Sequence, residues 1–268
     1  MTRWALGVEY DGACFNGFQR QSAAALATVQ GELESALTRI ADHPIRVVCA
    51  GRTDTGVHAT GQVIHFDSEA CRSERDWLRG GNSLTPSGIC IHWVRAVAPD
   101  FSARFSARWR RYLYLLTDVR PRQALLRDRI AGVAGPLDAD AMQRAAQHLL
   151  GEHDFSSFRA AQCQARHARR EVQEVAVRRA GALLGIEVQA NAFLQHMVRN
   201  IVGSLLEVGR QERAPEWIGE VLAARDRKLA GIAAPPEGLY LTAVGYDDSW
   251  NLPSPRLLAW PGSWGAST

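Results

Sequence analysis

The 268-residue sequence contains no run of about 18 apolar residues, the length that a membrane-spanning helix requires. Its first residues lead into a predicted strand rather than into the apolar core of a signal peptide. Five scattered cysteines, at positions 14, 49, 71, 90 and 163, form no Cys-x-x-Cys pair. An odd number of isolated cysteines argues against a disulfide or zinc framework. We therefore expect a cytoplasmic protein with reduced thiols and no membrane association.

Lysine is almost absent, because 30 of the 31 basic residues are arginine and Lys228 is the exception. Arginine is the better fork for phosphates and stacks well on bases. The net charge is only +3, so any surface for nucleic acid must be a local patch. The most basic window runs from Arg104 to Arg129 and contains eight arginines, at 104, 108, 110, 111, 120, 122, 127 and 129.

Hydrophobic periodicity predicts an α+β protein with two similar halves. In the first half, we expect strands at 4–9, 44–49, 61–67 and 89–97, with helices at 28–41 and from Ser73. In the second half, we expect strands at 106–117, 172–177, 183–190 and 239–246, with helices at 137–150, 193–209 and 215–225. This order predicts mostly antiparallel sheets with helices on one face and a catalytic cleft between the halves. We expect domains at 1–103 and 104–248, followed by a tail at 249–268.

Asp54 lies in the segment Gly51-Arg52-Thr53-Asp54-Thr55-Gly56, on a predicted turn between two strands. An arginine beside an aspartate keeps the carboxylate ionised, and an ionised aspartate serves as a nucleophile or base. The plain alternative is that Asp54 only caps the turn. Asp-Thr-Gly also occurs in aspartic proteases, but those need two carboxylates that share a proton. The chain has one such tripeptide, with Arg52 beside it, so we discard the protease hypothesis.

The predicted strand at 106–117 places Arg108, Arg110, Tyr112 and Tyr114 on one side, and Trp109, Arg111 and Leu113 on the other. Arginines and tyrosines along one face suit an RNA strand, although a solvated sheet face is an equal alternative. The loop around Gln19, with Phe15 and Phe18, is either another base-stacking element or an ordinary Gly-rich connection.

The sequence shows no metal or cofactor motif. The eight histidines lack metal-ligand spacing, and Gly12-x4-Gly17 lacks the Lys-Ser/Thr of a phosphate loop. An ionised aspartate with basic aromatic surfaces fits covalent chemistry on a nucleic acid without redox or phosphoryl transfer. Base isomerisation through an aspartyl adduct is one such reaction.

Several motifs resemble the tRNA pseudouridine synthase A family. They are Tyr10-Asp11-Gly12 with Phe15, Gly17, Gln19 and Gln21, then 51–59 around Asp54, Arg111-Tyr112-x-Tyr114, 193–203 around Arg199, and 238–241. The match runs from the first strand to about Tyr246. The family often has tryptophan at Phe18 and a basic residue at Leu113, and neither difference affects the proposed chemistry. The resemblance implies ferredoxin-like or RRM-like halves.

The resemblance also implies a cytoplasmic homodimer that converts uridines 38, 39 and 40 of the tRNA anticodon stem-loop to pseudouridine without cofactor or metal. Asp54 would then be the nucleophile, attacking either uracil C6 or ribose C1′. Tyr112 would stack on the flipped uracil and take the C5 proton, and Arg199 would pair with Asp54. Arg52 would shape the site and hold the displaced RNA, and Leu241 would floor the uracil pocket. The expected further RNA contacts are Gln19, His58, Arg110 and Arg111.

Two alternatives stay open at this point. One is an RNA-binding protein that has lost catalysis, against which Asp54, Tyr112 and Arg199 all argue. The other is a related synthase that acts on different uridines, which only substrate mapping separates.

Overall fold

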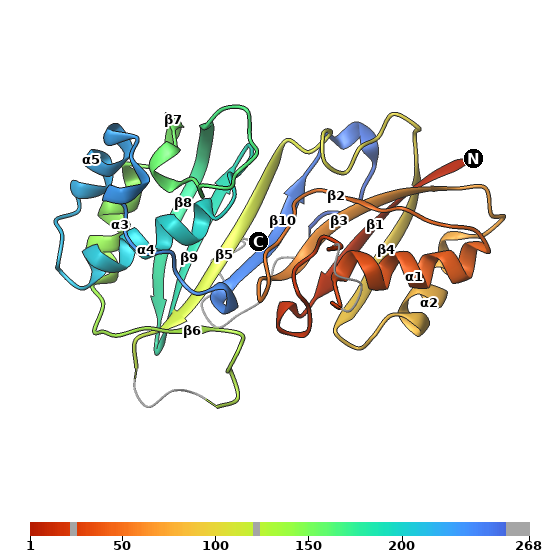
Figure 1. Cartoon of the computed structure of the whole chain (residues 1–268), viewed down its shortest axis with the longest axis horizontal. Helices are drawn as coiled ribbons and strands as arrows, with labels where there is room; N and C mark the ends of the chain where they lie inside the picture. The colour runs from red at the N-terminus through yellow and green to blue at the C-terminus, as the bar shows by residue number, and fades with distance from the viewer. Residues whose placement is uncertain (22–25, 120–123, 256–268) are drawn as a thin grey trace. The chain divides into compact units, whose positions relative to one another are not determined.

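The computed structural model describes residues 1–21, 26–119 and 124–255. The chain forms two compact units (Figure 1). Unit 1 comprises residues 1–108 and the described residues from Tyr240 onward, and unit 2 comprises residues 109–239. The sequence-based division at residue 103, with a tail from 249, stays a prediction about domains. The compact units follow other bounds because the last strand pairs with a strand of the N-terminal half.

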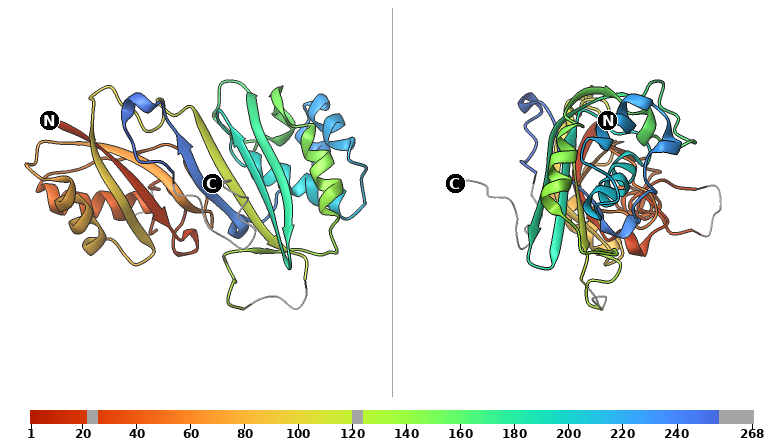
Figure 2. Two further views of the ribbon diagram at one scale, coloured as in Figure 1. Left: turned by 180° about the vertical axis from the view of Figure 1, so that it is seen from behind. Right: turned by 90° about the vertical axis from the view of Figure 1, so that its left-hand side faces the viewer.

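Unit 1 is a four-stranded sheet, with a short strand added, that two helices cover. Its elements are β1 (Thr2–Tyr10), α1 (Val29–Ala41), β2 (Val48–Cys49), β3 (His58–Ser68), α2 (Glu74–Leu84), β4 (Ile89–Val97) and β10 (Leu239–Gly245). The strand order is β4-β1-β3-β10, and β2 pairs with β3. All pairs are antiparallel except β3 with β10. Helices α1 and α2 lie on the same face of this sheet, as the front and back views show (Figures 1 and 2).

The helices of unit 1 begin where their capping residues predict. Thr28 accepts a hydrogen bond from the Gly31 amide, and Ser73 forms a capping box with Asp76. The fully buried Trp77 of α2 packs edge-on against Phe66 of β3, with a ring-centroid distance of 5.0 Å. The apolar core therefore lies between the helices and the sheet.

Strand β2 is shorter than the sequence predicts, because side chains of α1 bind part of the expected strand. The Ile45 amide donates to Thr38 Oγ1 at 3.0 Å, and the Val47 amide donates to Glu34 Oε1 at 3.1 Å. Those amides are therefore not available to a neighbouring strand. Only Val48–Cys49 pairs with β3.

Unit 2 is an antiparallel sheet with the order β5-β9-β8-β7, and β6 pairs parallel with β5. Its elements are β5 (Trp109–Thr117), β6 (Ala131–Gly132), α3 (Ala139–Gln147), β7 (Gly151–Asp154), β8 (Arg169–Ala180), β9 (Leu183–Ala190), α4 (Met197–Gly209) and α5 (Trp217–Ala224). Strands β8 and β9 form the predicted hairpin, and Gly181 in its turn has φ +59°. The α+β class with mostly antiparallel sheets is thus confirmed.

Strand β5 and helix α4 show the largest delays in unit 2 relative to their predicted starts. Strand β5 starts at Trp109, because Ser102 and Ser106 close a turn in which the Ser106 amide donates to the Ser102 carbonyl. Helix α4 starts at Met197, because His196 adopts a left-handed conformation with φ 61°. A left-handed residue interrupts a right-handed helix. Residues 193–196 therefore form a turn ahead of the helix.

The expected arginine and tyrosine ladder on β5 is wrong in part, because Arg108 precedes the strand and both tyrosines are buried. Tyr114 is fully buried, and its hydroxyl donates a 2.8 Å hydrogen bond to the Pro235 carbonyl. This burial raises the pKa of Tyr114 well above its usual range. Tyr114 is therefore a core residue of unit 2. Of the eight arginines in the basic window, Arg120 and Arg122 lie outside the described residues, as does the tail from residue 256.

Candidate active site

Asp54 lies on the turn that joins β2 to β3 in unit 1. The Val57 amide donates to the Asp54 carbonyl at 3.1 Å, which closes the turn, and Gly56 has φ +80°. A positive φ at this position suits glycine and few other residues, as the sequence predicts. Asp54 itself is half-buried, and its neighbour Thr53 is buried. Asp54 is thus a partly exposed residue of a closed turn between two strands.

A buried polar network holds the residues that precede Asp54. The Thr53 hydroxyl lies 2.8 Å from the Tyr10 hydroxyl, and Gln62 Nε2 donates to that same Tyr10 oxygen at 3.2 Å. Gln62 also donates to the Gly51 carbonyl at 2.6 Å and accepts from the Gly51 amide at 3.3 Å. Neither Tyr10 nor Gln62 is predicted from the sequence to have a role of its own. The one signal in the sequence is that Tyr10 belongs to the motif Tyr10-Asp11-Gly12.

The loop that contains Gln19 packs on the same turn. The Phe18 amide donates to the Thr53 carbonyl at 3.0 Å. Gly17 has φ +84°, and a Cβ there would lie 3.1 Å from the Thr53 carbonyl oxygen. Phe15 and Phe18 are buried, so they are core aromatics rather than exposed platforms for a base. Gln19 follows directly and is exposed, which leaves it available at the edge of the turn.

His58, the first residue of β3, is buried and serves contacts inside unit 1. Its Nδ1 accepts a 3.0 Å hydrogen bond from the Gly12 amide and lies 3.2 Å from an Asp11 carboxylate oxygen. Its ring stacks on Tyr240 at 4.7 Å. The parallel pairing of β10 with β3 places Leu241 beside Ala59. Unit 1 therefore brings Leu241 and His58 close to the Asp54 turn, whereas Arg52 on that turn is exposed.

Tyr112 and Arg199 belong to unit 2. Tyr112, on β5, is 8% exposed, and its ring packs edge-on against Phe193 with a centroid distance of 5.0 Å. Arg199 lies in the first turn of α4 and is part-buried. Its Nε donates to the Ala234 carbonyl at 2.7 Å, and the Ala234 amide donates to the Arg199 carbonyl at 2.9 Å. The segment 230–235 is thus attached to α4 at Arg199.

Gly203 explains how that segment approaches α4. A Cβ at Gly203 would lie 1.7 Å from the Ile232 carbonyl oxygen. The absence of a side chain at this glycine allows the backbone of segment 230–235 to touch the helix. The Gly231 amide also donates to Ser204 Oγ at 2.9 Å, so the segment is bound over a full turn.

The two remaining predicted contacts, Arg110 and Arg111, have partners within unit 2. Arg110 donates to the Asn191 carbonyl at 3.0 Å. Arg111 donates to Gln189 Oε1 at 3.0 Å and pairs with Glu174 at 2.6 Å. Glu187 is on the same strand as Gln189, and burial raises its pKa to about 6 in spite of the nearby Arg111. These strands therefore carry a mixed polar network rather than a row of arginines alone.

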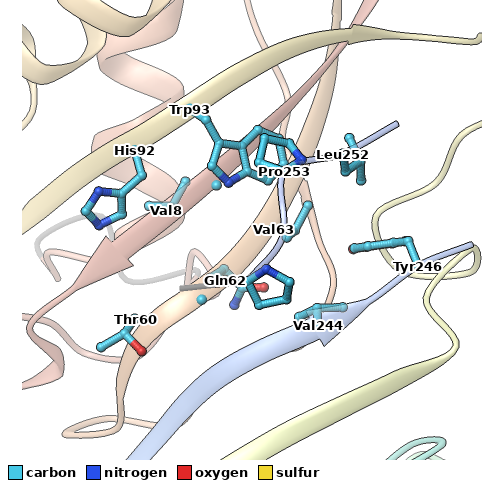
Figure 3. A pocket seen from close by; sticks show the side chains of 13 residues that line it. Val8, Thr60, Gln62, Val63, His92, Trp93, Val244, Tyr246, Leu252 and Pro253 are labelled. Atoms are coloured by element: carbon cyan, nitrogen blue, oxygen red, sulfur yellow. The ribbon is translucent and has the colours of Figure 1, made fainter. Parts of the chain in front are cut away.

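A small hollow in unit 1 is separate from the Asp54 turn. Figure 3 shows it between Trp93 and the segment that contains Leu252 and Pro253, with Tyr246 and Gln62 at its wall. Its volume of about 40 Å³ holds roughly two or three water molecules and is too small for a nucleobase. Among the described residues, no three histidine, cysteine or acidic side chains are grouped so that they could hold a metal. In the same ranges, no helix is long and apolar enough to cross a membrane.

Comparison with known proteins identifies the family. A family model described as tRNA pseudouridine synthase matches residues 7–106 and 145–247, a range that includes Asp54 and Arg199. The chain is 52% identical to a tRNA pseudouridine synthase A of Pseudoalteromonas atlantica, over 95% of this chain and 96% of that one. It is also 52% identical to a tRNA pseudouridine synthase A of Xanthomonas euvesicatoria, over 94% and 98% of the two chains.

A comparison of folds matches the crystal structure of a Cbf5-Nop10-Gar1 complex, with a TM-score of 0.38 and 12% identity. This match covers 89% of this chain and 49% of that one. The sequence matches extend over nearly the whole chain at an identity that establishes common descent. The chain therefore belongs to the tRNA pseudouridine synthase family and is an isomerase that converts uridine in tRNA to pseudouridine.

Proposed function

We propose that Asp54 is the nucleophile of this reaction and that the substrates are uridines 38, 39 and 40 of the tRNA anticodon stem-loop. One observation carries the nucleophile assignment. Asp54 is half-buried on a closed turn whose neighbouring residues are fixed to β1, β3 and the loop at 11–18. A nucleophile held in place in this way avoids the entropic cost of orienting it in each turnover.

The reaction is balanced without any external group, because the product is an isomer of the substrate. Asp54 attacks either uracil C6 or ribose C1′, and both routes stay open. The N1–C1′ bond breaks, the base turns, and a C5–C1′ bond forms. The bond between the Asp54 oxygen and C6 or C1′ then breaks, which restores the free carboxylate. The proton on C5 leaves, and N1 takes up a proton in exchange. The overall change therefore needs one carboxylate, a base for the C5 proton and a pocket in which the uracil turns.

Four further residues have proposed roles in this step. Tyr112 stacks on the flipped uracil and takes the C5 proton, and Leu241 forms the floor of the pocket. Arg199 pairs with Asp54 and keeps it ionised, while Arg52 shapes the site and holds the displaced RNA. Flipping a base costs a few kcal/mol of unstacking, which stacking on an aromatic ring offsets. The position of Leu241 beside Ala59, and the exposure of Arg52, support their parts of the proposal.

The proposed RNA contacts outside the reacting base are Gln19, His58, Arg110 and Arg111. The exposed Gln19 beside the Asp54 turn supports its assignment most directly. Phosphate contacts from arginine release counterions, so the affinity for tRNA is expected to fall steeply with salt. We also propose that the enzyme is a homodimer and that it acts in the cytoplasm. Analytical ultracentrifugation and cell fractionation test these two points.

The central experiment measures tritium release from C5-labelled uridine in unmodified tRNA, with wild type and Asp54→Asn compared. The expected result is release by wild type alone, with equal tRNA affinity and thermal melting for both proteins. Asn removes the charge but keeps the shape of the side chain, so the turn should persist. Release by Asp54→Asn at the wild-type rate would refute the nucleophile assignment.

The position assignment requires separate substrates. We would use transcripts that carry a single uridine at position 38, 39 or 40, and a control transcript with its uridine elsewhere in the stem-loop. Turnover of the first three alone supports the proposal. Turnover of the control transcript at a comparable rate would instead indicate a synthase for different uridines. Binding without turnover of any transcript would favour an RNA-binding protein.

A further inference from the structure

Asp54 depends on neighbours outside its own turn for its position. The turn from Gly51 to Val57 joins the two-residue strand β2 to β3. Strand β2 pairs with β3 only at Val48 and Cys49, followed by one hydrogen bond from the Ala50 amide to the Val63 carbonyl. Beyond Ala50, the backbone ladder ends. The side chains that bind the next residues therefore determine where the turn lies.

Gln62 extends this ladder by one step with its side chain. Its amide group both donates to the Gly51 carbonyl, at 2.6 Å, and accepts from the Gly51 amide, at 3.3 Å. A residue of a neighbouring strand would offer the same donor and acceptor through its backbone N–H and C=O groups. Gln62 is fully buried, whereas Gly51 is part-buried, so bulk solvent reaches these bonds from one side only.

Tyr10 connects Gln62 to the residue before Asp54. Its hydroxyl accepts from Gln62 Nε2, which leaves its own proton available for Thr53 Oγ1 at 2.8 Å. Tyr10 is 2% exposed and Thr53 is 7% exposed. The register between β1 and β3 shifts between Val8 and Tyr10, which accommodates one more residue on β3. Tyr10 and Gln62 thereby face each other although they are not register partners.

We propose that Tyr10 and Gln62 are positioning residues, which hold Thr53 and Gly51 so that the Asp54 carboxylate is aimed at the uridine. Neither residue touches the substrate in this proposal. The inference rests on the proposed role of Asp54 as the nucleophile. A displacement of about 1 Å at a reacting group costs on the order of 100-fold in rate, so the loss of one hydrogen bond in this network affects turnover more than binding.

The test uses Tyr10→Phe, which removes the hydroxyl and keeps the ring. We expect kcat for tritium release to fall roughly 10- to 100-fold, while KM for tRNA changes less than about threefold. The matched control is Tyr246→Phe, because that hydroxyl also donates within unit 1, to the Ala103 carbonyl at 2.7 Å, but away from the turn. It should lose some thermal stability and keep the wild-type kcat. Equal kcat values for Tyr10→Phe and wild type would refute the proposal.

A second set of variants keeps the proposal testable if Tyr10→Phe folds poorly. Thr53→Ser retains the hydroxyl and should retain most of the activity, whereas Thr53→Val should lose as much kcat as Tyr10→Phe. The double variant Tyr10→Phe/Thr53→Val should lose little more kcat than either single variant, because both substitutions break the same hydrogen bond. Losses that multiply would show that the two hydroxyls act independently, and would overturn the network.

The outcomes separate this inference from the function on which it rests. If Asp54→Asn is inactive and Tyr10→Phe is fully active, Asp54 is essential and the positioning network is wrong. If Asp54→Asn is active, the nucleophile assignment fails, and the positioning proposal fails with it. If Asp54→Asn is inactive, and Tyr10→Phe has a lower kcat with an unchanged KM, the nucleophile assignment and the positioning proposal are both supported.

Discussion

Arg199 and Ala234 bind each other twice, since the Arg199 side chain donates to the Ala234 carbonyl and the Ala234 amide donates to the Arg199 carbonyl. The donor in the first bond is Nε, so the two terminal nitrogens of the guanidinium can serve other partners. This arrangement fixes the plane of the guanidinium. In the role proposed for Arg199, orientation therefore matters as well as charge.

Arg199→Lys should reduce turnover by roughly 10- to 100-fold although the charge is unchanged. Lysine has a methylene group where arginine has Nε, so its single ammonium cannot bind the Ala234 carbonyl as Nε does and also present a planar fork to another partner. Tritium release under saturating tRNA measures the effect. Wild-type activity in this variant would show that the geometry at Arg199 matters little.

Tyr112→Phe and Tyr114→Phe should give opposite results on the same strand. Tyr112→Phe retains a ring for stacking, so we expect tRNA affinity to persist while kcat falls, if the hydroxyl moves the C5 proton. Tyr114→Phe should lower stability by about 1 to 3 kcal/mol, because the Pro235 carbonyl loses its buried partner, and should keep kcat. Thermal melting and tritium release on both variants provide the comparison. A fall in kcat for Tyr114→Phe alone would contradict this division of roles.

Gly203→Ala should destabilise unit 2. The added methyl would meet the Ile232 carbonyl, so segment 230–235 must move away from α4. Overpacking of this kind costs typically about 1 to 3 kcal/mol. The control is Gly132→Ala, because no atom lies within 4 Å of a Cβ at that position. Urea denaturation should separate the two variants, and equal midpoints would disprove the close approach at Gly203.

Glu187 should make the protein less stable as the pH rises from about 4.5 to about 6. Burial raises the pKa of Glu187 to about 6, so the folded state retains the proton that the unfolded state has already released. The stabilising effect is therefore fully present below pH 4.5 and lost above pH 6. For this half-buried group, we expect an effect of about 1 kcal/mol after allowance for solvent screening.

The measurement compares wild type with Glu187→Gln by urea denaturation at pH 4 and pH 8. The variant should gain stability relative to wild type at pH 8 and show less gain at pH 4. Glu171→Gln, an exposed site on the neighbouring strand, is the control. A relative stability of Glu187→Gln that is independent of pH would rule out titration at this site.

The sequence was sufficient to predict the elements whose signals are local. The caps at Thr28 and Ser73, the hairpin through Gly181 and the α+β class all follow from short-range patterns. The shortened β2 could not be predicted, because Glu34 and Thr38 bind the amides of Val47 and Ile45 from another element. Strand propensity does not show that side chains of another element will bind the backbone amides of a predicted strand.

The residues of the candidate site also differ in whether a local sequence signal reveals them. Motif residues such as Asp54 and Arg199 stand out in the sequence because their neighbours repeat a family pattern. Gln62 does not stand out in the sequence. Its role depends on the register between β1 and β3, and on the residue at which the pairing of β2 with β3 ends. The burial of Tyr114 was missed for a related reason. The alternation along β5 predicts which side chains share a face of the sheet, but it does not show which face is covered by the core.

The pairing of β10 with β3 has a consequence for biosynthesis. Unit 1 consists of two segments of the chain, and the second begins at Tyr240 of 268 residues. While the ribosome makes the protein, β3 therefore keeps an unpaired edge directly after the Asp54 turn until residues 109–239 have been translated. The described residues of unit 2 all precede Tyr240, so this unit can fold first. A chain released before residue 240 would expose that edge to aggregation, which makes late truncations more harmful than their length suggests.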